Sequence, residues 1–218
     1  MISFNTNIIN ADKNLILSIE TAVGGGSLSI LKNQIEIGGW IGTQGISKAE
    51  EVLEQILILL KGKNNISKEN IGLIVVSKSA GSLTGEKIGL ALAKGLAKSL
   101  RCRLIEISVF ESLLREQIFN LKPKGNYLTG IPFGKNRIQW QSFFVADKVT
   151  AEHNAPQIST CMELVEKISK FDYKKAILAG GIDKSCEQVF KQLNKSQIII
   201  TSKNLSYLNG LINVFITP

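Results

Sequence analysis

Two successive parts of the chain predict the same order of secondary-structure elements: strands first, then a helix, a strand, a helix and a strand. In the first part the predicted elements are strands at 15–21, 27–32 and 34–41, a helix at 47–61, a strand at 71–76, a helix at 84–100 and a strand at 104–107. In the second part they are strands at 127–133 and 137–145, a helix at 159–170, a strand at 175–179, a helix at 184–193 and a strand at 197–201. The two parts share no matching residues, so what repeats is the order of the elements.

This order predicts an α/β protein with a duplicated mixed β-sheet, and it resembles the two-lobed architecture of actin-like ATPases and sugar kinases. We expect an N-terminal lobe at 1–112 and a reduced C-terminal lobe at 113–218, with Lys122–Asn126 (KPKGN) near the boundary. Gly24–Gly26 should form a tight turn after the first strand. Ser47 and Glu50 should form a capping box at the start of the first helix.

Composition places the chain among ordered globular proteins. Of its 218 residues, 44% are hydrophobic and 20% are charged. The longest apolar runs fall far short of the roughly 18 residues that a membrane span needs, and the polar N-terminus lacks the features of a secretory signal. We therefore expect a cytoplasmic protein without membrane contact.

The cysteines and the net charge can each be interpreted in more than one way. Cys102, Cys161 and Cys186 are odd in number and show no Cys-x-x-Cys spacing, so we expect reduced thiols rather than disulfides or a zinc site. The formal net charge of +8 comes mostly from scattered lysines. This charge fits either a solvated lysine surface or direct binding of RNA.

The stretch Ser77–Gly89 (SKSAGSLTGEKIG) lies between a predicted strand and a predicted helix. Gly81 and Gly85 allow the backbone to approach a neighbour closely, and Thr84 could cap the helix, whose first amides would favour an anion. The spacing is not that of a Walker loop, and Glu86 would repel a phosphate. The simpler interpretation is that the glycines let the strand turn into the helix. Close packing is likewise the simplest reason for Gly89 and Gly95 inside the helix.

Two other glycine turns follow predicted strands, at Thr21–Gly26 and Ala179–Ile182 (AGGI). Glu20 and Asp183 lie beside them, and they make a weak set of carboxylates for magnesium. His153 is the only histidine and is expected at the surface. We therefore predict no catalytic residues, no metal site and no cofactor.

The first strand with its glycine turn, the helix SKAEEVLEQILILL and the stretch IGLIVVSKSAGSLTGEKIGLALAKGLAKSL resemble the bacterial TsaB (YeaZ) family of tRNA threonylcarbamoyladenosine biosynthesis proteins. The resemblance covers roughly residues 15–107. The family's loop usually reads Gly-Arg-Gly-Pro-Gly-Ser-Phe-Thr-Gly-x-Arg-Ile-Gly, and it is matched here at Gly81, Ser82, Thr84, Gly85, Ile88 and Gly89. It departs from the family at Ser77, Lys78, Ser79, Ala80, Leu83 and Lys87. Glu20 replaces the common Asp, and Lys48 stands where the family often has His.

The resemblance implies the actin-like ATPase fold in a subunit without catalytic equipment of its own. Its implied partners are a TsaD-like catalytic subunit and a TsaE-like ATPase, which modify the adenosine next to the tRNA anticodon, so that tRNA is met indirectly. The family pairs through helices of the first lobe, as heteromer or homodimer. The residues that we expect on this surface are Leu53, Ile56, Leu57, Leu60, Ile88, Leu92 and Gly95. Two alternatives remain: a small ATP-dependent kinase or carbamoyl-type transferase that uses Glu20 and the glycine turns, and a basic tRNA-binding protein.

Overall fold

The computed structural model of the chain describes residues 13–33, 35–42, 49–61, 66–78, 80–118, 124–146, 149–152, 154–179, 181–194 and 198–201. The chain divides into two compact units. Unit 1 contains the residues up to Lys78 together with Ser82–Val109, and unit 2 contains Gly81 and the chain from Phe110 through the last described strand. Each unit is built on one mixed sheet, so the prediction of a duplicated mixed sheet is confirmed.

Unit 1 contains a five-stranded sheet, which we call sheet A, with the strand order β3-β2-β1-β4-β5. The strands are β1 (Leu15–Glu20), β2 (Ser27–Lys32), β3 (Ile35–Ile41), β4 (Ile71–Lys78) and β5 (Arg103–Ser108). The first three pair antiparallel, whereas β4 runs parallel to β1 and β5 runs parallel to β4. Parallel neighbours need crossover connections. These connections contain α1 (Ala49–Lys61), the short 3-10 helix η2 (Lys68–Asn70) and α2 (Leu83–Leu100).

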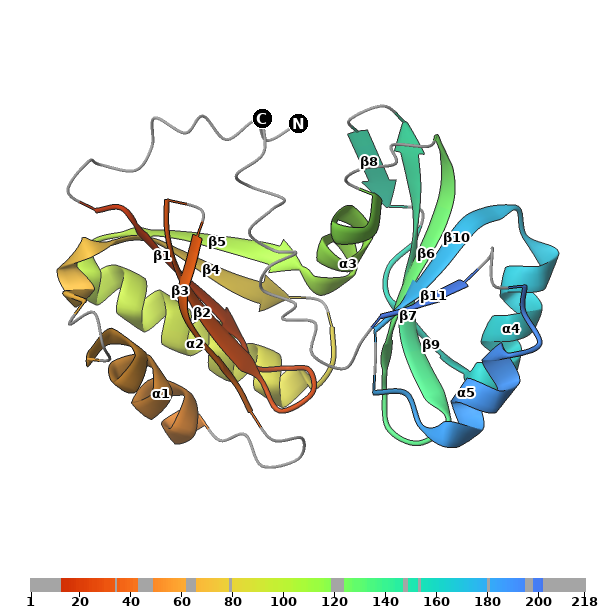
Figure 1. The fold of residues 1–218 in the computed structure, drawn as a ribbon, viewed down its shortest axis with the longest axis horizontal. Helices are drawn as coiled ribbons and strands as arrows, with labels where there is room; N and C mark the ends of the chain where they lie inside the picture. The colour runs from red at the N-terminus through yellow and green to blue at the C-terminus, as the bar shows by residue number, and fades with distance from the viewer. Residues whose placement is uncertain are drawn as a thin grey trace. The chain divides into compact units, whose positions relative to one another are not determined.

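The core of unit 1 lies between sheet A and the two helices, which lie along the same face of the sheet (Figure 1). Ile56 and Leu60 of α1, Ala93 of α2 and Leu17 of β1 belong to one buried cluster. Burying an aliphatic side chain of this size stabilises a fold by roughly 1.5–3 kcal/mol. The apolar period of α1 and α2 therefore determines which side of each helix packs against the sheet.

Unit 2 contains a six-stranded sheet, which we call sheet B, with the order β11-β10-β6-β7-β8 and with β9 also paired to β7. The strands are β6 (Gly125–Pro132), β7 (Arg137–Ala146), β8 (Val149–Glu152), β9 (Gln157–Thr160), β10 (Tyr173–Leu178) and β11 (Ile198–Ile200). The helices are α3 (Val109–Ile118), α4 (Cys161–Lys170) and α5 (Lys184–Phe190). Again a hairpin, β6 with β7, is followed by strands that run parallel to its first member. Side chains of α4 and α5 share one core cluster with sheet B.

The ends of two helices differ from the prediction. Ser82, not Thr84, caps α2, because its side chain accepts a hydrogen bond from the Gly85 amide. Residues 157–160 are extended as β9, and α4 begins only at Cys161, where Thr160 and Glu163 form a capping box. The elements α3, β8 and β9 were not predicted at all. The expected capping box of Ser47 and Glu50 lies outside the side chains that the structure describes.

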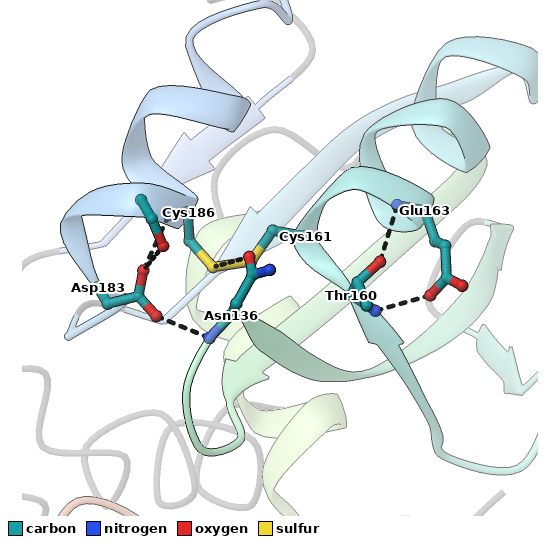
Figure 2. The surroundings of a disulfide bond; sticks show 7 residues. Asn136, Thr160, Cys161, Glu163, Asp183 and Cys186 are labelled. Atoms are coloured by element: carbon teal, nitrogen blue, oxygen red, sulfur yellow. Dashed lines mark hydrogen bonds between the residues drawn. A yellow bond between two sulfur atoms is a disulfide. The ribbon is translucent and has the colours of Figure 1, made fainter.

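The expectation that all three cysteines are reduced is wrong for two of them. A disulfide joins Cys161 and Cys186, which lie 25 positions apart in sequence (Figure 2). The chain passes through α4 and β10 before it reaches α5, and this path brings the two Cα atoms to 5.5 Å from each other. Cys102 is a free cysteine. The spacing of cysteines in the sequence could not reveal a pair that the packing of α4 against α5 creates.

None of the described helices combines the length and the apolar character needed to cross a membrane.

Candidate functional site

The first candidate site is the end of β1, where Glu20 enters the turn before β2. Its side chain is completely buried. Its Oε1 atom accepts hydrogen bonds from the amides of Ala22 (2.5 Å) and Val23 (2.9 Å), and Ser77 Oγ donates to it over 3.5 Å. The turn continues through Gly24, Gly25 and Gly26, whose φ angles of +60°, +95° and +84° favour glycine. The tight turn predicted from the three glycines is confirmed.

Burial changes the protonation of this carboxyl group. Desolvation raises the pKa of Glu20 to about 7, against the lowering effect of the hydrogen bonds from Ala22, Val23 and Ser77. The amides of Ala22 and Val23 are groups that a phosphate-binding turn would present to its ligand. Here they are engaged by the Glu20 side chain.

A set of buried serines surrounds Glu20 on the same face of sheet A. Ser18 lies directly opposite Ser29, and Glu20 lies directly opposite Ser27, in the antiparallel pair of β1 and β2. Because side chains alternate along a strand, these groups lie on the face opposite the one that α1 and α2 cover. Among the described residues nothing pairs with the three hydroxyl groups or with Glu20 Oε2. The sequence prediction missed this set, although the alternation in LILSIE and SLSILK could have revealed it.

The glycines of the family loop pack against the residue after Glu20. A Cβ atom on Gly85 would lie 2.3 Å from the Thr21 carbonyl oxygen, and one on Gly89 would lie 2.2 Å from Thr21 Oγ1. Thr21 Oγ1 donates to the Gly85 carbonyl (2.7 Å), and the Ser82 amide donates to the Ala22 carbonyl (2.8 Å). The interpretation of Gly85 and Gly89 as packing residues is thus supported.

The other two residues of the loop motif have different surroundings. Gly81 adopts a φ of +75°, and its amide donates to Oε1 of Gln139 over 2.7 Å. Thr84 is exposed in the first turn of α2. The structure therefore brings Ser82, Gly85 and Gly89 together against the β1–β2 turn, but not Gly81 or Thr84.

The predicted partner surface divides into exposed and buried residues. Leu53 and Leu57 are 40% and 46% exposed, and Ile58, which the prediction did not include, is 51% exposed. Ile56 and Leu60 belong to the core beneath α1, so their assignment to an outer surface was wrong: they lie on the buried side of the same helix. On α2, Ile88 and Leu92 are half-buried, and Gly95 is exposed, with no atom within 4 Å of the point where a Cβ atom would lie. Close packing therefore does not explain Gly95 within the described part of this chain.

The second glycine turn precedes α5, where Asp183 is the N-cap (Figure 2). Asp183 Oδ1 accepts from the Cys186 amide (2.9 Å) and from Ser185 Oγ, and Oδ2 accepts from the Asn136 amide (2.8 Å). The hydrogen bonds from Ser185, Asn136 and Cys186 lower the pKa of Asp183 to about 2. Asp183 thus has partners within unit 2, as Glu20 has within unit 1. His153 lies outside the described residues, which contain no cluster of three or more His, Cys, Asp or Glu side chains.

Comparison with known proteins yields one family match in sequence. Residues 29–130 match the family model described as TsaD, tRNA N6-adenosine threonylcarbamoyltransferase. This range begins in β2 and ends in β6, and it includes both α1 and α2. No curated protein matches the chain in sequence.

Solved structures share the fold. YeaZ from Pseudomonas aeruginosa superposes with a TM-score of 0.64 at 12% identity, over 92% of this chain and 90% of that chain. A second protein from Pseudomonas aeruginosa, described as similar to peptidase YeaZ, gives a TM-score of 0.65 at 12% identity, over 92% of this chain and 89% of that chain. A Bacteroides thetaiotaomicron protein described as having an actin-like ATPase fold gives 0.52 at 11% identity, over 92% and 96%. The chain has the actin-like ATPase fold, as its element order predicted.

Proposed function

We propose that this chain, a divergent TsaB-like protein, acts in the tRNA threonylcarbamoyladenosine modification system as a non-catalytic scaffold subunit. In this role it binds a TsaD-like catalytic subunit, which works with a TsaE-like ATPase on the adenosine next to the tRNA anticodon. The chain itself binds no cofactor and meets tRNA through its partner.

The exposed apolar side of α1 is the observation that carries this proposal. Leu53, Leu57 and Ile58 are all 40% exposed or more, on a helix whose other side is buried in the core. Contiguous exposed apolar residues on an otherwise packed element are typical of protein interfaces. The helix also lies inside the part of the chain that matches the TsaD family model.

The hydrogen bonds within the β1–β2 turn support the non-catalytic part of the proposal. The carboxyl group of Glu20 accepts the amides of Ala22 and Val23, which a phosphoryl group would need as donors. With desolvation raising the pKa of Glu20 to about 7, the group is also a poor permanent anion for a magnesium ion. A kinase or transferase that used this turn would first have to displace the carboxyl group.

Measuring the mass of the protein in solution tests the proposed role as a scaffold subunit. We expect the purified chain, mixed with the TsaD-like subunit from the same source, to form a heteromer that size-exclusion light scattering detects. If both chains are folded and no heteromer forms, the proposal is wrong. Calorimetry with ATP and magnesium tests the enzyme alternative, for which we expect no binding heat to the isolated chain.

Leu57→Glu tests the location of the interface. A charge at a desolvated apolar contact should weaken the heteromer at least tenfold, which corresponds to about 1.4 kcal/mol. The matched control is Ile158→Glu on β9 in unit 2, because Ile158 is exposed to a similar extent, 49% against 46% for Leu57. Equal weakening by both substitutions, or by neither, would contradict an interface on α1.

Direct tRNA binding is the second candidate, favoured by the formal net charge of +8. Phosphate contacts release counterions, so the affinity for tRNA would fall steeply with salt concentration. We expect the isolated chain to show no such salt-dependent retention of tRNA in a filter-binding assay. Retention that disappears between low and moderate salt would instead support this candidate.

A further inference from the structure

Basic side chains gather at one end of unit 1, where α1 and α2 finish and β4 and β5 begin (Figure 1). At this end the start of β1 pairs with the end of β2 and with the start of β4. Lys13 Nζ donates to the carbonyl oxygens of Leu100 (2.8 Å) and Arg101 (3.3 Å), so it joins the start of β1 to the end of α2. We call this the basic end. Its basic residues are Lys13, Lys32, Lys61, Lys68, Lys98 and Arg101.

The positive charge of the basic end is not balanced within the described chain. All of its basic residues except Lys13 are exposed. None of them takes part in an ion pair between described residues. Two acidic residues, Glu36 on β3 and Glu69 in η2, lie at the same end against these six basic ones. An excess of one sign of charge on a surface attracts a partner of the opposite sign.

The basic end continues the exposed apolar side of α1. Lys61 follows Leu57 by four positions and Ile58 by three, so the three exposed side chains lie on one side of the helix. On α2, Lys98 follows the exposed Gly95 by three positions. Protein interfaces combine an apolar centre with a polar, solvent-accessible rim. The basic end is placed where the rim of an interface centred on α1 would lie.

This neighbourhood favours an acidic protein over RNA as the partner. RNA phosphates would satisfy the lysines, but they would leave the apolar side chains of Leu57 and Ile58 uncovered. A protein surface with an apolar contact and adjoining carboxylates matches both parts at once. Glu54, exposed one turn before Ile58, carries the opposite charge, so the positive charge lies at only one end of this side of α1.

We propose that the basic end is the charged rim of the α1 interface and meets an acidic surface of the TsaD-like subunit. The inference rests on the proposed scaffold function and adds the chemistry of the partner's surface. Opposite charges at a rim steer two proteins into encounter, so they raise the association rate constant and make it fall with salt. The dissociation rate constant depends mainly on the apolar contact.

The association rate of the full chain with the TsaD-like subunit, measured by stopped flow, tests the rim. Lys61→Gln with Lys98→Gln removes two charges and keeps good helix formers in α1 and α2. We expect the association rate constant to fall about threefold or more at low ionic strength and the difference to disappear at high salt. The dissociation rate constant should change less than about twofold. An unchanged association rate constant would overturn the proposal.

Lys170→Gln with Lys184→Gln is the matched control. Both residues are exposed, both belong to helices of unit 2, and the pair removes the same charge. This variant should associate at the wild-type rate. Equal slowing by the two pairs would show an effect of net charge alone and would overturn the proposal.

Two further results distinguish this inference from the scaffold proposal. A heteromer that Leu57→Glu weakens, but that forms at the same rate at all salt concentrations, would keep the scaffold function and overturn the charged rim. Salt-dependent retention of tRNA by the isolated chain, abolished by Lys61→Gln with Lys98→Gln, would show that the basic end binds RNA and would also overturn it.

Discussion

Unit 1 and unit 2 share a sheet arrangement but hold the corresponding turns by different chemistry. In unit 1 the β1–β2 turn is hydrogen-bonded to the start of α2, the helix that follows β4. In unit 2 the β6–β7 turn is hydrogen-bonded to the start of α5, the helix that follows β10. In unit 1, the Ser82 amide bonds the Ala22 carbonyl, and Gly85 and Gly89 fit against Thr21. In unit 2, the carboxylate of Asp183 at the start of α5 accepts a hydrogen bond from the Asn136 amide, and a disulfide joins Cys186 of α5 to Cys161 of α4.

The comparison shows that the topology requires a contact between a hairpin turn and a helix start, and that the two sequences make this contact in different ways. Both sheets bring a hairpin turn next to a helix start, because β4 and β10 lie beside β1 and β6 and their helices begin at the same edge. In unit 1 this contact relies on glycines, which have no side chain and so let α2 lie close to the turn. It therefore depends on steric fit. Unit 2 makes it with an anion, so it depends on charge. The two units should therefore respond differently to substitution and to pH.

The largest effect should come from Gly85→Ala in unit 1. The added Cβ atom would lie 2.3 Å from the Thr21 carbonyl oxygen and 2.9 Å from Ala22 Cα, and both are backbone atoms that cannot turn aside. We expect the free energy of unfolding to fall by about 3 kcal/mol, measured by urea denaturation. Gly95→Ala is the matched control on the same helix. Nothing lies within 4 Å of its Cβ position, so this change should stabilise α2 by up to about 1 kcal/mol. A similar result for both substitutions would contradict the steric explanation.

The buried carboxyl of Glu20 should make unit 1 sensitive to pH near neutrality. Its pKa is raised from 4.5 to about 7 in the folded chain, so the folded state holds this proton more tightly than the unfolded state does. This contribution to stability is fully present below pH 4.5 and is lost as the pH rises through about 7. The loss should amount to about 3 kcal/mol at most.

Glu20→Gln measures that contribution. Glutamine keeps an acceptor for the amides of Ala22 and Val23 but does not titrate, so the fall in unfolding free energy between pH 5 and pH 8 should become shallower by about 1 kcal/mol or more. Glu54→Gln, at an exposed position of α1, is the control and should leave the slope unchanged. An unchanged slope in Glu20→Gln would show that Glu20 is ionised throughout this range.

The smallest effect should come from Asp183→Ala in unit 2. Loss of an N-cap acid typically costs about 1 kcal/mol, and the hydrogen bond to Asn136 is lost as well. Because the pKa of Asp183 is lowered to about 2, its contribution is present above the ordinary pKa of 3.8 and is lost as the pH falls through about 2. Thermal unfolding at pH 7 and at pH 2 should show a smaller difference between variant and wild type at the lower pH. A difference that does not change with pH would mean that the charge of Asp183 plays no part.

The sequence predicted the regular elements well and the site only in part. The apolar period predicted the helix α1, and the apolar run at 15–21 predicted β1 as a buried strand, because a helix or strand shows its period in its own sequence. The same reasoning placed Ile56 and Leu60 on an outer surface, since a periodic stripe does not tell which partner it meets. It also missed α3, β8 and β9; β8 and β9 are strands of four residues each, and both pair with β7.

The sequence by itself determined the duplicated order of elements, the glycine turn after β1 and the apolar face of each long helix, because these depend on propensities and periods of neighbouring residues. The tertiary structure decided that Cys161 and Cys186 form a disulfide and that Glu20 is buried with a raised pKa. It also decided that Gly85 and Gly89 pack against Thr21, whereas no described atom lies within 4 Å of the Cβ position of Gly95. Each of these depends on residues from a different strand or helix, and contacts between elements far apart in the chain appear only when the sheets assemble.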